Sequence, residues 1–449
     1  MLIKVRVENF KSFSKPTELT MISSSKIRRL QEHRINVRST RLLKHAVIYG
    51  ANAAGKSNLV EIFQFIQYVL QEGLPVQSSK LFCRTKEENA EKESVFELQF
   101  SVGDGFYAYG FSAILSKRII TSEWLYSLNQ NGSSQCIFER ENTKKAKTYL
   151  NLETNERIRF DTYSDDFVSN ETSLFISELN RGKQYELNSK LVVIKKVYTW
   201  LTENIVLYTP NKRFVDLKYY YNDESLSKII KLIQTFDTGI SSIHIQNINM
   251  EEFQKKIPQE ILNDVLNDLK TQSTQINKGS IHASIRIHNS FFNITLNQNQ
   301  EYEVTTIMLK HGTSPYNFTF DEESTGSRRI FDLIDILLQP GNDVVFIIDE
   351  LERSLHPLIT DHFLKLFSTI HGGKKTQLIF TTHEASIMDQ NHFRRDEFWF
   401  VDRDGKNESS IYSLDRFKDR FDKDINKAYF QGRYGAIPAV AKLQKTEVE

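Results

Sequence analysis

The strongest constraint on the fold of this chain is the segment Gly50–Ser57, which reads Gly-Ala-Asn-Ala-Ala-Gly-Lys-Ser. It matches the phosphate-loop pattern G-x-x-x-x-G-K-[ST] at every position. The apolar run 46–49 predicts a strand before the loop, and apolar residues at helical spacing from Leu59 to Leu70 predict a helix after it. A glycine loop that opens a helix directs backbone N–H groups at phosphate. The segment therefore predicts a nucleoside triphosphate site.

Each residue type in this loop has an expected role. Lys56 is expected to reach the β- and γ-phosphates, and the Ser57 hydroxyl is expected to bind Mg²⁺. The loop backbone is expected to surround the phosphates. The predicted nucleotide-binding residues are Gly50, Ala51, Asn52, Ala53, Ala54, Gly55, Lys56, Ser57 and Asn58.

A second part of the site is predicted far downstream. Val344–Ile348 is a continuous apolar run, typical of a central strand that is buried on both faces, and it ends in Asp349-Glu350. This is a Walker B pattern, in which Asp349 holds hydrated Mg²⁺ and Glu350 accepts a proton from the attacking water. An acid pair after a strand is also compatible with a solvated turn. Asp349 lies 293 residues after Lys56, so a large insertion must separate the two halves of one site.

The split phosphate loop and Walker B resemble those of ABC-type ATPase heads, and two further segments resemble other motifs of that class. Ser324-Thr325-Gly326-Ser327 precedes a helical apolar stripe and lies where a signature loop is expected, although a plain helix cap would give the same pattern. The segment 377–383, which has Leu-Ile-Phe at 378–380, predicts another buried strand that ends in His383. His383 fits a switch histidine that contacts the γ-phosphate. We also consider Gln99 as the Q-loop glutamine, because it lies in the strands after the first helix.

These motifs resemble the ABC-like AAA ATPases related to RecF, SMC and OLD proteins. The opening Ile3–Phe13 is similar to their first strand, and Asn52 and Asn58 are typical of their phosphate loop. The segments 349–357 and Gly432–Pro438 narrow the resemblance to ATPases of anti-phage defence systems. Those systems include PARIS, which we consider most similar, and Septu, with the OLD ATPase domain as a further relative.

The resemblance implies an α/β fold: an ABC-type ATPase head with a P-loop mixed β-sheet core and a β-rich lobe, carrying a helical insertion. Residues 1–210 would form the half of the head with the phosphate loop and the β lobe. Residues 211–280 would form the helical insertion. Residues 281–449 would form the half with the signature, Walker B, the D-loop (Leu351–Pro357) and the switch histidine. The implied ligands are ATP and Mg²⁺.

The same resemblance implies partners. Family members pair head to tail and hold each nucleotide between the phosphate loop of one subunit and the signature of another. Ser324, Thr325, Gly326 and Ser327 would then act on a neighbour's ATP. In the defence group the ATPase holds a separate effector, commonly a nuclease, and releases it when a phage component is sensed. We therefore expect a homo-oligomer, a separate effector protein and a phage protein trigger.

Three parts of this sequence depart from the pattern of these ATPases. Ala54 stands where relatives often have Ser or Gly, and Ser-Thr-Gly-Ser replaces Ser-Gly-Gly. Only 66 residues follow His383, too few for the Toprim nuclease domain of OLD proteins. Asp402 and Asp404 resemble a Toprim acid pair only superficially, and we interpret Asp404-Gly405 as a hairpin turn.

Two other functions are considered. A RecF-like DNA-repair ATPase would use the basic stretch between Lys26 and Lys44, which has seven Lys or Arg against the single acid Glu32, to bind nucleic acid. A solvated loop would explain the same stretch. A nucleotide-binding module with little turnover is disfavoured by the complete set Lys56, Ser57, Asp349, Glu350 and His383.

Bulk properties exclude some classes. The net charge of +1 gives no global preference for nucleic acid or anionic membrane. No apolar run is long enough to span a bilayer, and charged residues interrupt the N-terminus where a signal peptide would need an apolar stretch. Cys83 and Cys136 have neither metal nor redox spacing. These observations predict a cytoplasmic chain without a membrane partner.

The middle of the chain is expected to be helical. Leu226, Ile229, Ile230, Ile233 and Phe236 form one apolar stripe. A second stripe, Phe253, Ile257, Ile261, Val265 and Leu269, is interpreted as another helix. Strands are expected to resume at Ile281.

Overall fold

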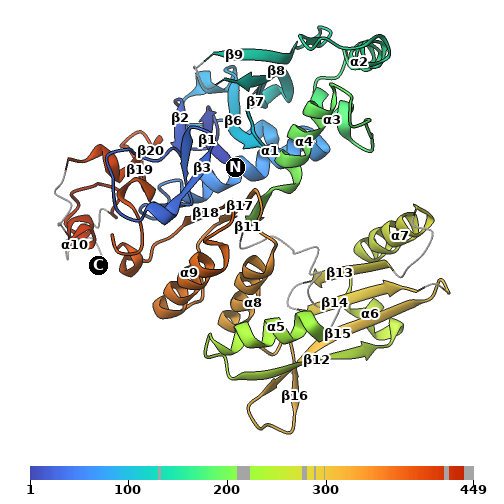
Figure 1. Ribbon diagram of the computed structural model, residues 1–449, viewed down its shortest axis with the longest axis vertical. Coiled ribbons are helices and arrows are strands. Elements are labelled where there is room, and N and C mark those ends of the chain that lie inside the picture. The colour runs from blue at the N-terminus through green and yellow to red at the C-terminus, as the bar shows by residue number, and fades with distance from the viewer. Residues whose placement is uncertain are drawn as a thin grey trace, which may run out of the picture. The chain divides into compact units, whose positions relative to one another are not determined.

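The computed structural model divides the chain into two compact units (Figure 1). The first unit comprises Met1–Thr209, Gly341–Leu351 and His371–Glu449, and the second comprises Pro210–Pro340 and Glu352–Ile370. The structure describes residues 1–129, 133–209, 223–275, 281–287, 290–297, 299–418 and 424–438.

A six-stranded sheet organises the first unit, in the order β11-β17-β18-β5-β19-β20. Its first five strands are parallel to their neighbours, and β20 pairs antiparallel with β19. The central strands are buried nearly throughout, as continuous apolar runs require. The strands are β5 (His45–Tyr49), β11 (Ile205–Tyr208), β17 (Val344–Ile348), β18 (Thr376–Thr381), β19 (Phe398–Arg403) and β20 (Ser409–Ser413).

An antiparallel seven-stranded sheet forms the β lobe of the same unit, in the order β10-β9-β8-β7-β6-β1-β2. β6 and β7 pair as a tight hairpin, with Val102 opposite Gly105 and the turn at Gly103-Asp104. The strands are β1 (Leu2–Glu8), β2 (Thr17–Thr20), β6 (Ser94–Val102), β7 (Gly105–Ile114), β8 (Ile119–Leu128), β9 (Ser134–Glu141) and β10 (Lys147–Thr148).

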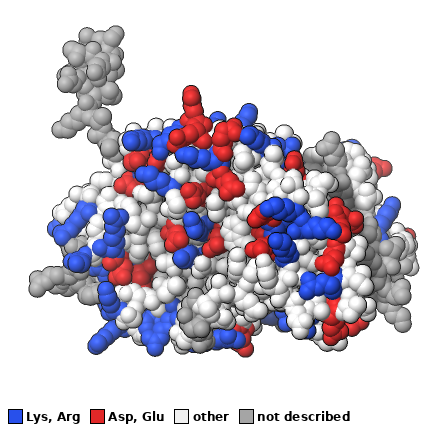
Figure 2. Space-filling model, turned by 90° about the horizontal axis from the view of Figure 1, so that it is seen from above, with Lys and Arg blue, Asp and Glu red and all other residues white. Residues whose placement is uncertain are grey.

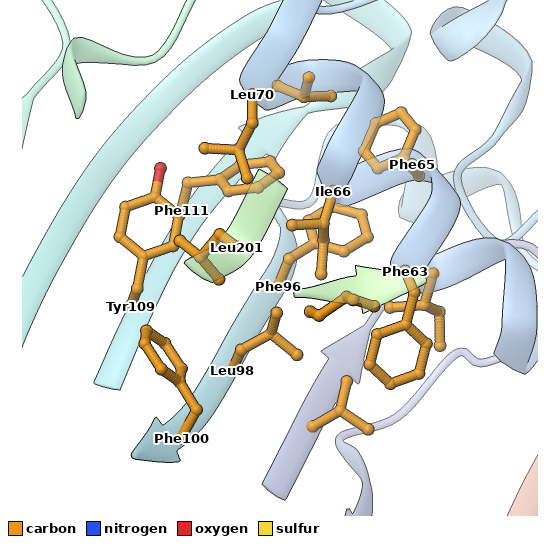
Figure 3. Close-up of a cluster of buried hydrophobic side chains, with 14 of the residues drawn as sticks. Phe63, Phe65, Ile66, Leu70, Phe96, Leu98, Phe100, Tyr109, Phe111 and Leu201 are labelled. Atoms are coloured by element: carbon orange, nitrogen blue, oxygen red, sulfur yellow. The ribbon is translucent and has the colours of Figure 1, made fainter. Parts of the chain in front are cut away.

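Helix α1 (Lys56–Glu72) belongs to the core that joins the two sheets. Side chains around most of its circumference are buried, which is the pattern of a helix enclosed on several sides. Phe65 packs on Phe96 of β6 with ring centroids 4.9 Å apart, and Phe96 stacks on Phe111 of β7 at 5.0 Å (Figure 3). The same cluster contains Ile48 and other residues of the six-stranded sheet. The phosphate loop is thereby attached to a helix whose apolar side chains belong to the main hydrophobic core of the unit.

The first unit also contains shorter elements. β3 and β4 form a separate two-stranded sheet. These elements are β3 (Arg34–Val37), β4 (Thr40–Leu43), α2 (Thr154–Asp166), α3 (Phe175–Asn180), α4 (Val192–Glu203), α10 (Ile425–Phe430), and the 3₁₀ helices η1 (Gln31–His33), η2 (Val76–Lys80), η3 (Glu87–Ala90), η4 (Leu115–Lys117), η6 (Ala385–Ile387), η7 (Arg395–Glu397) and η8 (Leu414–Arg416).

The second unit is a five-stranded sheet with helices. The strand order is β12-β15-β14-β13, with β16 paired to β15. The elements are β12 (Ile240–Ile248), β13 (Ile281–Ile287), β14 (Ser290–Leu296), β15 (Tyr302–His311), β16 (Asn317–Thr319), α5 (Asp223–Gln234), α6 (Met250–Lys256), α7 (Gln259–Gln275), α8 (Thr325–Leu338) and α9 (Pro357–His371).

This division differs from the predicted domains. The predicted helical insertion, 211–280, contains α5, α6 and α7, but it also contains β12, which pairs with β15 outside that range. The compact unit extends to Pro340 and takes in Glu352–Ile370 as well. Residues 211–222 and 276–280 of the predicted insertion lie outside the described residues.

The second predicted helical stripe is two helices rather than one. α6 ends at Lys256, and Ile257 is extended, with φ −122° and ψ 135°. Pro258 follows, and a proline disfavours the helical conformation of the residue before it. The single helix was therefore a wrong interpretation. Phe253, Ile257 and Leu269 are buried nonetheless, as the stripe predicted.

The surface carries both charges. On the face shown in Figure 2, basic and acidic side chains are interspersed, and neither sign covers it continuously. In the part of the chain that the structure describes, no helix combines the length and the apolar composition needed to cross a membrane.

Candidate functional site

Two glycines of the phosphate loop are required by their surroundings. A Cβ at Gly50 would lie 2.5 Å from the carbonyl oxygen of Val401 in β19. Gly55 has φ +113°, and its Cβ would lie 2.6 Å from the Ser409 hydroxyl and 2.8 Å from the Ser12 hydroxyl. The loop is therefore held between the β19–β20 hairpin and the segment after β1, in a conformation that only glycine adopts at low cost.

Lys56 lies inside the loop that precedes it. The residue is 7% exposed, and its ammonium donates to the carbonyl oxygens of Gly50 at 2.8 Å and Ala51 at 3.2 Å. The same nitrogen is 3.5 Å from Nδ1 of His383. Loop and switch histidine, which are 327 positions apart in sequence, are thus neighbours in the first unit.

The strand register explains why the phosphate loop and His383 lie close together. β18 lies between β5 and β17, with Thr381 opposite Ile48 and Phe380 opposite Ile348. All three strands are parallel, so the residues that follow them meet at one edge of the sheet. Carboxyl ends of parallel strands are where α/β sheets bind ligands.

The Walker B acids are fixed by the neighbouring strand. Asp349 is 6% exposed and accepts a hydrogen bond on Oδ1 from the Thr381 hydroxyl at 2.6 Å. The N–H of Glu350 donates to the same hydroxyl at 2.8 Å, and the N–H of Leu351 donates to the Thr381 carbonyl at 3.1 Å. Glu350 has φ +51°, so the chain turns sharply there. Motif spacing gave no role to Thr381, although its place two residues before His383 was a signal.

The donor set at this edge fits Mg²⁺. Ser57 is exposed on the first turn of α1, and Asp349 presents a carboxylate at the end of β17. Hydroxyl and carboxylate oxygens are hard ligands, and Mg²⁺ is commonly bound through one or two of them with substrate phosphates and water. The roles of Ser57 and Asp349 as ligands stay predictions.

A hollow of about 720 Å³ opens beside the loop. Ala53 and Asn58 line it, and the Arg403 guanidinium donates to the Ala53 carbonyl at 3.3 Å. The cations in its wall are Lys11, Lys80, Arg84, Arg403 and Lys406. Lys11 pairs with Glu61, and burial lowers the pKa of Lys11 below its ordinary value. The hollow is suited to an anionic group, and sequence reasoning missed it because its residues come from four separate segments.

The predicted signature segment begins helix α8 in the second unit. Ser324 is the N-cap, and its hydroxyl accepts from the N–H of Ser327 at 3.0 Å, so the helix-cap interpretation is confirmed. A Cβ at Gly326 would lie 2.9 Å from the Ser354 carbonyl, in the predicted D-loop. The signature and D-loop segments are therefore packed together within this unit.

Two other sequence candidates have structural explanations. Gln99 lies in β6 and donates to Glu97 at 3.1 Å, a contact within the seven-stranded sheet. Asp402 and Asp404 belong to the β19–β20 hairpin, where Asp404 accepts from the N–H groups of Lys406 and Glu408 at 2.9 Å each. The hairpin interpretation of Asp404-Gly405 is confirmed.

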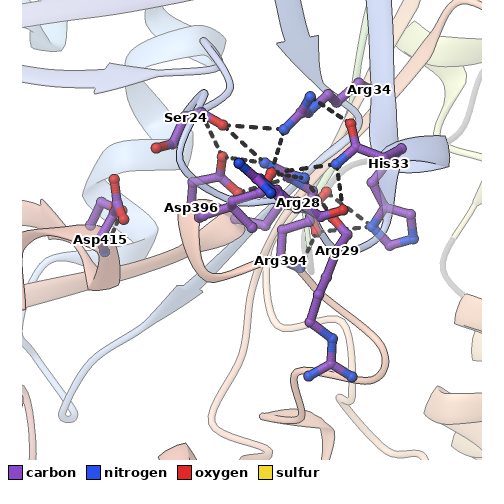
Figure 4. Close-up of polar contacts among 12 residues, drawn as sticks. Ser24, Arg28, Arg29, His33, Arg34, Arg394, Asp396 and Asp415 are labelled. Atoms are coloured by element: carbon purple, nitrogen blue, oxygen red, sulfur yellow. Dashed lines mark hydrogen bonds and ion pairs between the residues drawn. The ribbon is translucent and has the colours of Figure 1, made fainter. Parts of the chain in front are cut away.

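Residues of the basic stretch between Lys26 and Lys44 form hydrogen bonds with other parts of the first unit (Figure 4). Arg34 donates to the carbonyl oxygens of Ile27 at 2.5 Å and Ser24 at 3.2 Å. The buried Arg394 donates to the Arg29 carbonyl at 2.7 Å and forms an ion pair with Asp396 at 2.8 Å. These contacts hold the stretch against the segment around η7 that leads to β19. Arg28, Arg38 and Arg41 are exposed.

A second polar cluster lies at the opposite edge of the six-stranded sheet. His33 and His45 direct Nδ1 at the fully buried Glu397 carboxylate, 2.9 and 3.1 Å away. The N–H of Arg394 donates to that carboxylate at 2.7 Å. Burial opposes ionisation of Glu397, but the two imidazoles outweigh it and lower its pKa. Burial lowers the pKa of His45 as well, despite the carboxylate beside it. We call this the His-Glu cluster; its ligand atoms lie within 4.8 Å of one another, and each already has a hydrogen-bond partner.

Comparisons with curated proteins and with solved structures give weak similarity or none. No curated protein matches the sequence significantly. The chain is similar to an SMC head bound to the C-terminal winged-helix domain of ScpA, at 13% identity and TM-score 0.40, over 92% of this chain and 97% of that one. It is similar to the SMC head domain of Thermotoga maritima at 13% identity and TM-score 0.31, over 92% of this chain and 98% of that one. These scores are too low to carry an assignment.

A family assignment comes from the sequence profile. Residues 46–389 match the family described as "AAA domain, putative AbiEii toxin, Type IV TA system". The matched range begins in β5, includes the phosphate loop and Walker B, and ends just beyond His383. The chain belongs to this AAA family.

Proposed function

We propose that this chain is a Mg²⁺-dependent ATPase of ABC-like architecture. The observation that carries the proposal is the meeting of the loop lysine, the Walker B acids and His383 at one edge of a parallel sheet. A complete set of this kind is what phosphoryl transfer to water needs, because that chemistry depends on positioning and charge.

The residues divide the work as follows. Lys56 and the N-terminal N–H groups of α1 would bind the β- and γ-phosphates of ATP. Mg²⁺, held by Ser57 and Asp349, would neutralise charge on the phosphates. Glu350 would accept the proton of the water that attacks in line, and His383 would contact the γ-phosphate. The hollow beside the loop supports binding of the rest of the nucleotide.

We propose that a second copy completes each site. Helix α8 begins at Ser324, and a helix N-terminus is suited to phosphate. Ser324, Thr325, Gly326 and Ser327 would contact the γ-phosphate of a neighbour's ATP, so that ATP joins two subunits. The Ser324 and Ser327 hydroxyls are also bonded to each other at 3.0 Å, which uses one of their two protons and leaves the other to donate to phosphate.

The biological role proposed is that of a sensor and scaffold in anti-phage defence. Support comes from the motif resemblance to PARIS-type ATPases and from the family description, which names a toxin of a toxin–antitoxin system. The chain would hold a separate effector, such as a nuclease, and release it when a phage protein is sensed.

Two measurements test this proposal. Phosphate release from ATP is expected with Mg²⁺ and is expected to stop with EDTA; a chain that neither binds nor hydrolyses ATP would refute the ATPase. Affinity purification from the native host is expected to recover an effector encoded beside this gene. If deletion of this gene leaves phage sensitivity unchanged, the defence role is wrong.

RecF-like DNA repair is the alternative. The exposed Arg28, Arg38 and Arg41 favour it, whereas the structural use of Arg34 disfavours it. It predicts ATP-dependent duplex binding that weakens steeply with salt and is lost in the double variant Arg28→Glu and Arg41→Glu. Absence of duplex binding removes this alternative.

A further inference from the structure

One buried hydroxyl connects the two Walker B acids. Thr381 is fully buried at the end of β18. Its Oγ1 donates to Asp349 Oδ1 at 2.6 Å and accepts from the N–H of Glu350 at 2.8 Å. A hydroxyl has one proton to give and lone pairs to accept with, so both bonds can form together. One side chain thus contacts the proposed metal ligand and the backbone of the proposed general base.

This contact replaces regular strand pairing. The β17–β18 ladder runs from Val344 to Ile348, and Asp349 is the next residue. There the N–H of Asp349 donates to the Tyr208 carbonyl on the other side, at 2.9 Å. Glu350 then turns to φ +51°, a conformation that a non-glycine residue adopts only when its surroundings hold it. The Thr381 hydroxyl and carbonyl bond the N–H groups of Glu350 and Leu351 and so hold this turn.

We propose that Thr381 is a positioning residue for hydrolysis, which orients Asp349 toward the metal and Glu350 toward the attacking water. The proposal rests on the ATPase proposed above. The hydrogen bond to Oδ1 fixes the rotation of the Asp349 carboxylate and therefore the direction in which its remaining lone pairs face the proposed Mg²⁺. Groups that hold metal ligands in this way typically change metal affinity or activity by roughly 10–100-fold when they are removed.

The test is Thr381→Val, which keeps the shape of the side chain and removes the hydroxyl. The Mg²⁺ concentration that gives half-maximal ATPase activity is expected to rise by about 10-fold or more. kcat at saturating Mg²⁺ is expected to fall by roughly 10–100-fold. ATP affinity in EDTA is expected to stay unchanged, because Lys56 and the loop are intact. Thr381→Ser, which restores the hydroxyl, is expected to return Mg²⁺ dependence to that of the wild type.

A matched control lies on the same strand. Thr376 is also buried, at the start of β18, and its hydroxyl donates to the Gly341 carbonyl at 3.0 Å. Thr376→Val therefore removes an equally buried hydroxyl bond away from the acids. It is expected to keep the Mg²⁺ dependence of the wild type, even if its Tm falls.

The outcomes are separable. Wild-type kcat and wild-type Mg²⁺ dependence in folded Thr381→Val would overturn the positioning role while leaving the ATPase in place. A wild-type chain that neither binds nor hydrolyses ATP would instead refute the proposed function. If Thr381→Val does not fold, Thr381→Ala decides the question: it must show the raised Mg²⁺ requirement, and unchanged Mg²⁺ dependence would overturn the proposal.

Discussion

Histidine and carboxylate side chains lie at both ends of the parallel strands of the six-stranded sheet, and we call these ends the His45 edge and the Gly50 edge. The two edges differ in how far these side chains are exposed. β5 links them: His45 begins the strand, and Gly50 follows its end. At the His45 edge, the His-Glu cluster is buried, and Nδ1 of both histidines and the N–H of Arg394 bond the Glu397 carboxylate. At the Gly50 edge, Ser57 and His383 are exposed, and Glu350 is half-buried in a left-handed turn.

This difference separates structural polar residues from candidates for chemistry. A buried polar group must have hydrogen-bond partners, and the His-Glu cluster supplies them to its carboxylate from within the fold. A group that remains exposed at the end of a buried strand is compatible with substrate. Burial distinguishes Ser57, Glu350 and His383 from the His-Glu cluster where residue type does not.

The largest expected effect is on ATP turnover, and it is tested by the same substitution at two lysines. Lys56 and Lys44 lie at different edges, and each is 7% exposed. Lys56 donates to loop carbonyls, whereas Lys44 donates to the Gly372 carbonyl. Lys56→Met should lower kcat/KM for ATP by at least about 10²-fold, as loss of one transition-state contact typically does. Lys44→Met should leave turnover per folded molecule unchanged. Phosphate release and a thermal melt of both variants measure this, and equal activities would break the comparison.

The next effect is on stability. Glu397→Gln removes the charge of the His-Glu cluster and leaves buried donors imperfectly paired, at an expected cost of about 2 kcal/mol. Chemical denaturation should show the loss, and ATP turnover per folded molecule should not change. Reduced turnover in a folded Glu397→Gln chain would mean that the two edges are functionally coupled.

The smallest effect is a pH dependence of stability. The pKa of His45 is lowered in the fold, so below its unfolded value of about 6.5 the unfolded chain binds a proton that the folded chain does not. Stability should therefore fall as pH decreases from about 7 to 5, by about 1.4 kcal/mol for each unit of pKa difference. His45→Gln removes this proton site, so its Tm should fall less over the same range. Parallel Tm curves for the two proteins would contradict the account.

The sequence predicted the local elements around the phosphate loop well. The apolar segments before Asp349 and before His383 were predicted to be buried strands, and they are β17 and β18. Such segments are recognisable because central parallel strands are buried on both faces. The Ile281 strand and the Asp404 turn also followed from local patterns. In each case the deciding signal lies within a few residues of the element.

Contacts between segments that are distant in the sequence could not be predicted from local patterns. His33 and Glu397 are 364 positions apart, and nothing in either local pattern predicts their contact. Arg34 and Arg394 similarly hold the basic stretch in place by hydrogen bonds to backbone carbonyls of that stretch. From local charge alone, the basic stretch was interpreted as a solvated loop or a nucleic-acid surface. Pro258 was a local signal, but the regular apolar spacing on both sides concealed the break.

The most direct test of the central claim is ATP turnover and ATP retention by Glu350→Gln beside the wild type. Glu350 lies at the edge assigned to chemistry, and the substitution removes the proton acceptor without changing shape. The account predicts a Tm close to that of the wild type, retained MgATP binding and turnover reduced by at least about 10²-fold. Wild-type turnover in Glu350→Gln would contradict it.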